Sequence, residues 1–132
     1  MAVKPVLVDS SYYIRLARLG IDPLQTLGMA SMERDLAVCG VVRCEVARGI
    51  RQQSILEKFQ RFWDVMIYVP SDLHLWKEVE ETVWQLDRKG ITLPLTDIVI
   101  GCSAKKIGAA VLTFDDHFYK IPELKVVQSL ES

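Results

Sequence analysis

The sequence predicts an α/β protein in which a mostly parallel sheet is covered by helices on both faces. Short apolar segments, typical of buried strands, alternate with longer segments in which apolar residues recur every three or four positions. Gly, Pro, Asp and Ser separate these segments and favour turns and helix ends. Strands that alternate with helices favour a parallel sheet, because each helix carries the chain back across the sheet before the next strand.

The first half of the chain is predicted to contain two strands and four helices. Residues 5–8 form an apolar run that stops at an aspartate, which suits a buried strand. Two serines and helically spaced Tyr and Leu then predict a helix over 10–20, and an Asp-Pro pair begins another helix. The apolar residues 36–39 predict the second strand. Apolar positions spaced by four predict a helix over 42–50, and a second helical stripe covers 55–63.

The second half continues the alternation with three strands and two long helices. Residues 65–69 are predicted as a strand that a proline closes. A Ser-Asp pair caps a helix over 71–90, and a further helix covers 96–108 after another proline. Residues 109–112 form the fourth predicted strand. A turn or short helix then leads to a fifth strand over 124–127.

Composition limits the class of protein. The 132 residues, half of them hydrophobic, suit one domain over residues 1–132 with a sizeable core. No apolar run approaches the roughly 18 residues that a membrane span needs, and no signal peptide is evident, so we expect a soluble cytoplasmic protein. A net charge of −1 argues against binding nucleic acid by bulk charge alone. Three cysteines without metal-site spacing are expected to be reduced and mostly buried.

Acidic residues occur close to the ends of several predicted strands. Asp9 ends the first strand, Glu45 lies early in the helix after the second, and Asp115 and Asp116 follow the fourth. Asp97 begins the helix that leads into the fourth strand, and its position leaves open which edge of the sheet it reaches. Ligands bind at the carboxyl edge of open parallel sheets. Carboxylates that converge there without Lys or Arg would suit Mg²⁺ or Mn²⁺, which prefer oxygen ligands.

Each acid also has an ordinary structural explanation. Asp9 and Asp97 could cap helices or complement a helix dipole, and acids in turns are common. Glu45 could pair with Arg43 or Arg48 on a solvated face. However, Glu45 lies beside the apolar stripe of its helix, where an unpaired acid is costly.

Four segments, taken together, resemble the PIN domain family. They are PVLVDSS, VVRCEVARGI, LTDIVIGCSAKK and LTFDDHFYKIPELKV. They occur in the family's order over essentially the whole chain, and the closest resemblance is to bacterial VapC-type toxins of toxin–antitoxin pairs. The resemblance implies a three-layer α/β/α sandwich with a five-stranded parallel sheet. It also implies a ribonuclease that uses Mg²⁺ or Mn²⁺ held by three or four acids.

The resemblance assigns catalytic and metal-binding roles to particular acids. It places them at Asp9, Glu45, Asp97 and Asp115, the last being two residues after Thr113, as in the family's closing motif.

Neighbouring residues take lesser roles in this resemblance. Asp116 and Thr113 become auxiliary, and Ser11 is favoured over Ser10 as the hydroxyl that follows the first aspartate. His117 stands where many relatives carry an acid or a histidine, and we interpret it as a packing residue or a phosphate neighbour.

Charge distribution and the resemblance together suggest partners. The stretch 41–61 is basic, so Arg15, Arg43 and Arg48 are candidates for contacts with an RNA backbone, although they could also be ordinary solvated residues. The resemblance implies a homodimer and a cognate antitoxin that lays a peptide across the active-site groove.

Other functions stay open at this point. A PIN nuclease could process RNA without being a toxin, and an antitoxin-like reading frame upstream would separate these two roles. A different class is a non-catalytic α/β module that binds a metal or a protein. A phosphoacceptor receiver domain expects an early acidic pair, and a haloacid-dehalogenase-like phosphatase expects a second aspartate at the position of Ser11. The sequence has neither.

Overall fold

A five-stranded sheet forms the centre of the protein, which a computed structural model describes over residues 4–130. The strand order is β3-β2-β1-β4-β5, and every neighbouring pair is parallel. This confirms the predicted α/β class, and the sheet is parallel throughout rather than mostly so. The strands are β1 (Val6–Val8), β2 (Leu36–Cys39), β3 (Ile67–Val69), β4 (Ala110–Leu112) and β5 (Val126–Val127).

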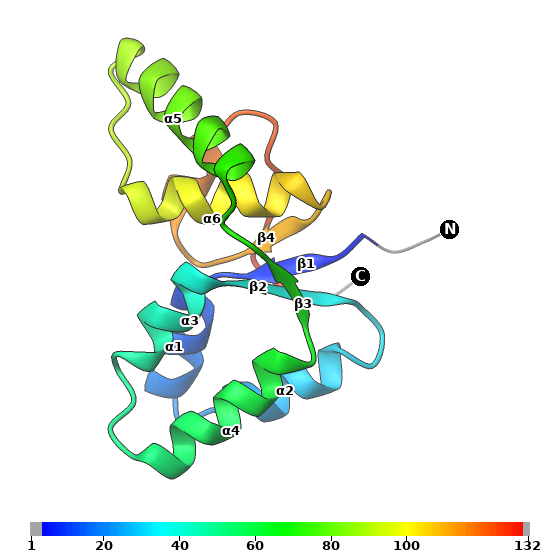
Figure 1. Cartoon of the computed structure of the whole chain (residues 1–132). Helices are drawn as coiled ribbons and strands as arrows, with labels where there is room; N and C mark the ends of the chain where they lie inside the picture. Colours follow the sequence, from blue (N-terminus) through cyan, green and yellow to red (C-terminus); the bar gives the residue numbers. More distant parts are fainter. Residues whose placement is uncertain (1–3, 131–132) are drawn as a thin grey trace.

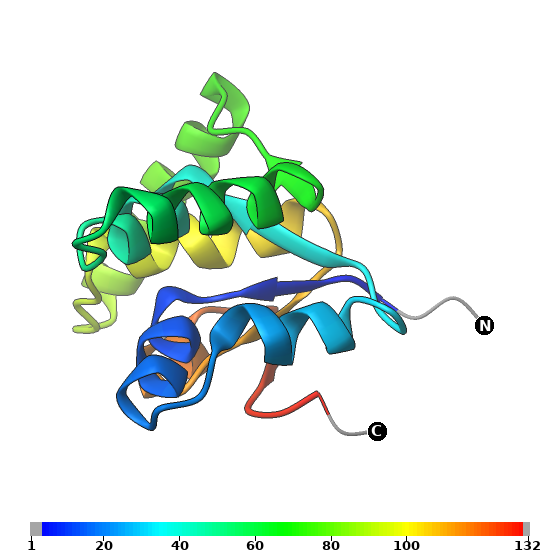
Figure 2. The same cartoon turned by 90° about the horizontal axis from the view of Figure 1, so that it is seen from below.

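Helices cover the sheet in two layers, as Figure 1 shows. One layer holds α1 to α4 and the other holds α5 and α6, so the expected three-layer arrangement is confirmed. Viewed from the side of the first layer, α2 and α4 lie nearest to the reader (Figure 2). A short 3-10 helix, η1 (Asp116–Lys120), follows β4. The helices are α1 (Ser10–Arg18), α2 (Pro23–Ala30), α3 (Gly40–Ala47), α4 (Gln53–Asp64), α5 (Leu73–Arg88) and α6 (Leu95–Lys106).

The core is built around the central strand. All residues of β1 are buried, because β2 and β4 pair with it on either side and helices cover both faces. In the first helical layer, Trp63 of α4 packs edge-on against Tyr13 of α1, and its Nε1–H donates a 3.1 Å hydrogen bond to the Tyr13 hydroxyl. This bond satisfies two buried polar groups and ties α4 to α1.

Some element boundaries differ from the sequence expectations. The third strand begins at Ile67 rather than at residue 65, because α4 continues to Asp64 and Val65 caps it. The Met66 N–H then bonds to the carbonyl of Trp63, which still belongs to the helix. The fifth strand is limited to Val126–Val127.

The three cysteines are free thiols, as expected, but they differ in exposure. Cys39 and Cys102 are buried, and burial raises the pKa of both thiols. Cys44 is exposed, so two of the three thiols are buried, in agreement with the expectation that they are mostly buried. Within residues 4–130, no helix is long and apolar enough to cross a membrane.

Candidate metal centre

The first acid of the candidate site, Asp9, stands directly after the central strand. Its backbone N–H donates to the carbonyl of Leu112 in β4, at 2.9 Å, which continues the sheet by one residue. Its side chain caps α1 with a long bond from the Ser11 N–H, at 3.4 Å. The residue is only 2% exposed. The capping role foreseen as an alternative is therefore present, and it fixes a carboxylate at the carboxyl edge of the sheet.

Hydroxyl groups connect Asp9 to the end of β4. The Oδ2 atom of Asp9 accepts hydrogen bonds from Ser11 Oγ at 2.7 Å and from Thr113 Oγ1 at 2.8 Å. Thr113 Oγ1 in turn accepts the backbone N–H of Asp115, at 2.9 Å. The buried Thr113 therefore joins the loop that carries Asp115 to the carboxylate of Asp9. Ser11 Oγ makes a second link, because it also accepts the Phe114 N–H, at 3.2 Å.

Glu45 reaches the same group of residues from α3. Ser10 Oγ donates to Glu45 Oε1 at 2.9 Å and also lies 3.4 Å from Asp9 Oδ1. Among the described residues, Glu45 forms no ion pair with Arg43 or Arg48. Both serines therefore take part, Ser10 toward Glu45 and Ser11 toward Asp9, whereas the sequence analysis favoured Ser11 alone.

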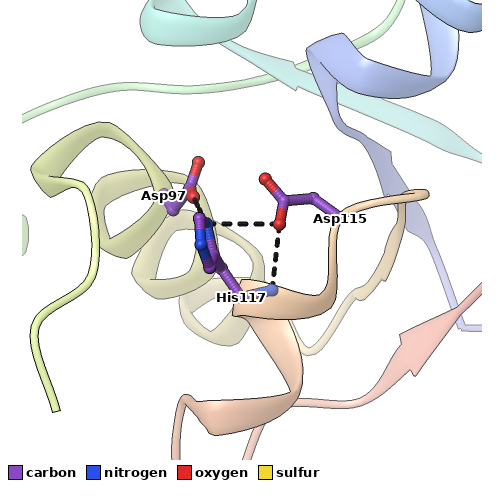
Figure 3. A group of neighbouring side chains, drawn as sticks. All are labelled: Asp97, Asp115 and His117. Carbon is purple, nitrogen blue, oxygen red and sulfur yellow. Dashed lines mark hydrogen bonds and ion pairs between the residues drawn. The ribbon is translucent and has the colours of Figure 1, made fainter.

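Asp97 lies at the same edge of the sheet, which the sequence left open. It occupies the first turn of α6 and is 8% exposed. His117 of η1 connects it to Asp115, because His117 Nδ1 is 2.9 Å from Asp97 Oδ2 and 3.2 Å from Asp115 Oδ1 (Figure 3). Asp115 also caps η1 by accepting the His117 N–H at 2.9 Å. One donor atom from each of these residues lies within 4.8 Å of the others.

Two connected groups thus make up the site. One contains Asp9, Ser10 and Glu45, and the other contains Asp97, Asp115 and His117. Thr113 joins the two groups, because its hydroxyl donates to Asp9 and accepts the Asp115 N–H. The pKa of Asp97 is raised, first by burial and then by the negative charges of Asp115 and Asp9, while the hydrogen bond from His117 opposes the shift.

The raised pKa of Asp97 has a consequence for stability. A carboxyl group whose pKa is raised in the folded state favours folding when it is protonated, so this contribution is lost as pH rises through the folded pKa. We therefore expect Asp97→Asn to increase the free energy of unfolding at pH 7 in metal-free buffer, and the gain to shrink as pH falls. Urea denaturation at several pH values measures this. A variant less stable than the parent at pH 7 would contradict it.

A groove borders the acids on the side of α1. It has a volume of about 790 Å³ and is lined by Ser10, Arg15, Phe114, Asp115 and His117, among others. The Arg15 guanidinium lies over the ring of Phe114, 4.9 Å from its centroid, and Tyr12 stacks on the same ring. This places a cation beside the carboxylates without an ion pair to them.

A second groove, of about 1050 Å³, adjoins the first and shares Ile14 and Arg18 with it. Glu45 and Arg48 line it together with apolar residues of α1, α3 and α4. Arg43 lies elsewhere, in a separate hollow, where it pairs with Asp64 at 3.1 Å and covers the ring of Trp63. Of the three arginines predicted to contact RNA, Arg15 and Arg48 line the grooves beside the acids.

The contacts of the His117 side chain were not predicted from the sequence. The residue was interpreted as a packing residue or a phosphate neighbour, but its ring nitrogen lies between two acids. The signal available in the sequence was its spacing, two residues after Asp115, which lets a tight turn fold the imidazole back toward that carboxylate. Its contact with Asp97 crosses to a different helix and could not be read from spacing.

The donor atoms fit a divalent cation. Among residues 4–130, no Lys or Arg forms an ion pair with Asp9, Asp97 or Asp115, and His117 is their sole basic partner there. Carboxylates that are buried and close together repel one another, and a bound cation would relieve both this repulsion and the cost of burial. Oxygen donors suit Mg²⁺ or Mn²⁺. The arrangement is therefore suited to metal-assisted hydrolysis.

We compared the chain with models of known protein families, with curated protein sequences and with solved structures. A family model described as PIN domain matches residues 6–124. No curated protein sequence matches the chain.

Solved structures share the fold at low sequence identity. A chain of the DNA-bound VapBC structure from Salmonella typhimurium aligns with a TM-score of 0.75 and 16% identity, over 95% of this chain and 98% of that chain. VapBC-5 from Mycobacterium tuberculosis, a member of a family of toxin–antitoxin systems, aligns with a TM-score of 0.65 and 17% identity, over 96% of this chain and 100% of that chain. VapC20 from Mycobacterium tuberculosis, a toxin that cleaves the sarcin-ricin loop, aligns with a TM-score of 0.64 and 18% identity, over 91% of this chain and 98% of that chain.

Proposed function

The chain belongs to the PIN domain family, and we infer that its function is that of a nuclease of this family. The protein is proposed to be a divalent-metal-dependent endoribonuclease that cleaves single-stranded or loop RNA. Its proposed role is the toxin of a toxin–antitoxin pair, with Mg²⁺ or Mn²⁺ as the cofactor. The observation that carries the proposal is the meeting of Asp9, Glu45, Asp97 and Asp115 at one edge of the sheet, linked by Ser10, Thr113 and His117.

The acids have different proposed tasks. Asp9, Asp97 and Asp115 would hold the metal, because all three surround the junction between β1, β4 and α6. Glu45 completes the set from α3 and is the natural candidate to orient an attacking water, since Ser10 holds it near Asp9. A bound divalent ion would activate water and stabilise the charge on the cleaved phosphate. The hydroxyls of Ser11 and Thr113 keep Asp9 in one orientation.

The grooves support a polyanion as substrate. Arg15 borders the acid cluster and Arg48 lines the adjoining groove, so a phosphate backbone that crosses the acids could meet a positive charge on either side. The Arg15 guanidinium is exposed and covers the half-buried ring of Phe114, so its outer face offers a planar surface on which an unstacked base could stack. The likeness to VapC20, which cleaves a loop, supports the same substrate class.

The proposed toxin role rests on the structural likeness. VapBC-5 is described as a member of a family of toxin–antitoxin systems, and the alignment covers 96% of this chain and 100% of the VapBC-5 chain. By this analogy the protein would bind a cognate antitoxin and form a homodimer. A small antitoxin-like reading frame directly upstream would support the toxin role over a role in RNA processing.

Cleavage of a labelled RNA tests the proposed chemistry. We expect the protein to cut single-stranded or loop RNA in Mg²⁺ or Mn²⁺, to lose this activity in excess chelator, and to regain it when the ion is returned. Duplex DNA of the same sequence serves as the control substrate and should stay intact. Cleavage that persists in chelator would contradict the metallonuclease assignment and leave a non-catalytic binding module as the better explanation.

A further inference from the structure

His117 lies where a metal ligand would lie. Its Nδ1 atom is 2.9 Å from Asp97 Oδ2 and 3.2 Å from Asp115 Oδ1, and the three atoms form one group (Figure 3). The ring comes from η1, whereas Asp97 comes from α6 and Asp115 from the loop after β4. Three separate elements thus direct a donor atom toward one point at the edge of the groove.

We propose that His117 is a nitrogen ligand of the bound metal and that it shifts the site's preference from Mg²⁺ toward Mn²⁺. This inference rests on the proposed function, and it names a ligand other than a carboxylate. It gives the proposed metal centre a mixed donor set of two carboxylate oxygens and one imidazole nitrogen on the side of Asp97 and Asp115.

The distances suit adjacent positions around an octahedral ion. Two donors at right angles, each about 2.1 Å from a metal, lie about 3 Å apart. The two distances from Nδ1 to the carboxylate oxygens are 2.9 and 3.2 Å. Both distances therefore match those between adjacent ligands of one octahedral ion.

The backbone supports this position of the ring. The His117 N–H donates to Asp115 Oδ1, and the Asp115 N–H donates to Thr113 Oγ1, so the turn between the two side chains is held at both ends. Phe118, the next residue, is completely buried and anchors η1 in the core. The His117 side chain itself is 44% exposed, so its Nε2–H can face water while Nδ1 binds the ion.

The chemistry of the donors sets the direction of the selectivity. Mg²⁺ is a hard cation that strongly prefers oxygen ligands. Mn²⁺ also binds oxygen ligands, but as a transition-metal ion it binds an imidazole nitrogen more strongly than Mg²⁺ does. Replacing one oxygen ligand by the Nδ1 atom of His117 therefore weakens the binding of Mg²⁺ more than the binding of Mn²⁺.

Electron spin-echo spectroscopy of Mn²⁺ bound to the whole protein, without RNA, tests the assignment. We expect nuclear modulation from a directly bound imidazole ¹⁴N in the wild type. His117→Asn should lose the modulation and bind Mn²⁺ about tenfold or more weakly by calorimetry, with a smaller loss for Mg²⁺. The chain has two histidines, so His74→Asn is the matched control and should keep both the modulation and the affinity.

The outcomes separate this inference from the proposed function. If Mn²⁺ binds, Asp9→Asn weakens its binding and the wild type shows no ¹⁴N modulation, then His117 is not a ligand and the carboxylate site stands. If Mn²⁺ does not bind, or if Asp9→Asn leaves its affinity unchanged, the proposed metal site itself is wrong. The wild-type spectrum decides the first question even if His117→Asn fails to fold.

Discussion

Asp9→Asn is expected to reduce the rate of RNA cleavage by about 100-fold or more. Asp9 is the buried acid at the end of the central strand, and hydroxyl groups of Ser11 and Thr113 hold its carboxylate in place. The amide oxygen of asparagine can accept both of these hydrogen bonds, and its nitrogen would face Ser10. The substitution therefore removes one charge from the metal site while leaving the local fold intact. Initial rates at saturating Mn²⁺ measure the effect.

A matched control separates loss of chemistry from loss of structure. Asp72 also caps a helix, because it accepts the Leu75 N–H at 2.9 Å at the start of α5. It pairs with Lys106, at the opposite end of α6 from Asp97. Asp72→Asn should therefore cleave RNA at the wild-type rate. An Asp9→Asn variant that is folded and as active as the wild type would overturn the assignment of Asp9.

The second large effect is expected at Asp115 and not at its neighbour. Asp115 is in contact with His117 and bonds through its backbone to Thr113, whereas Asp116 is exposed and lies outside the Asp97, Asp115 and His117 group. Asp115→Asn should therefore reduce cleavage about 100-fold. Asp116→Asn should stay within about threefold of the wild type, as is usual for an exposed side chain without partners of this kind.

The Asp115 and Asp116 pair provides an internal comparison, since the two variants carry the same change at adjacent positions. Mn²⁺ affinity by calorimetry should follow the cleavage rates, with a clear loss for Asp115→Asn alone. If both variants lost Mn²⁺ affinity and cleavage activity equally, the total negative charge of the turn would determine metal binding, and Asp115 would not be a specific ligand. A larger loss at Asp116 would reverse the assignment that the spacing from Thr113 supports.

Most of the fold followed from local patterns in the sequence. The residues of β1 are buried on both faces, and a continuous apolar run of that length is what a central parallel strand requires. The end of α4 was less predictable. Val65 is apolar and 83% exposed, and it caps the helix instead of beginning the strand. Apolar character alone does not distinguish these two roles, because the difference depends on which residue next pairs with β2.

The candidate site was predictable where it depends on strand ends. The end of a strand directs the next residue to the carboxyl edge, so Asp9 and Asp115 could be placed there from the sequence. Asp97 could not, because it starts a helix and the side of the sheet on which that helix begins depends on packing. Its contact with His117 spans 20 residues and exists only in the assembled fold.

Long-range contacts also decided the roles of Glu45 and Arg43. Spacing along α3 allowed a pair between Glu45 and a nearby arginine. Instead, Glu45 accepts a hydrogen bond from Ser10, which is 35 residues away, and Arg43 pairs with Asp64 of α4. The two side chains therefore contact different helices, Glu45 the first residue of α1 and Arg43 the last residue of α4. Either a hydroxyl group or an arginine can donate a hydrogen bond to a carboxylate such as that of Glu45, and the folded structure determines which of them is close enough to do so.

The position of a bound ion tests the central claim most directly. Crystals soaked in Mn²⁺ and measured at a wavelength where manganese scatters anomalously would locate it without relying on activity. We expect an anomalous peak at the carboxyl edge of the sheet, within bonding distance of carboxylate oxygens from Asp9 and from Asp97 or Asp115. A peak elsewhere, or no peak at these acids in crystals that bind Mn²⁺ at other sites, would contradict a metal-dependent nuclease centre built from these residues.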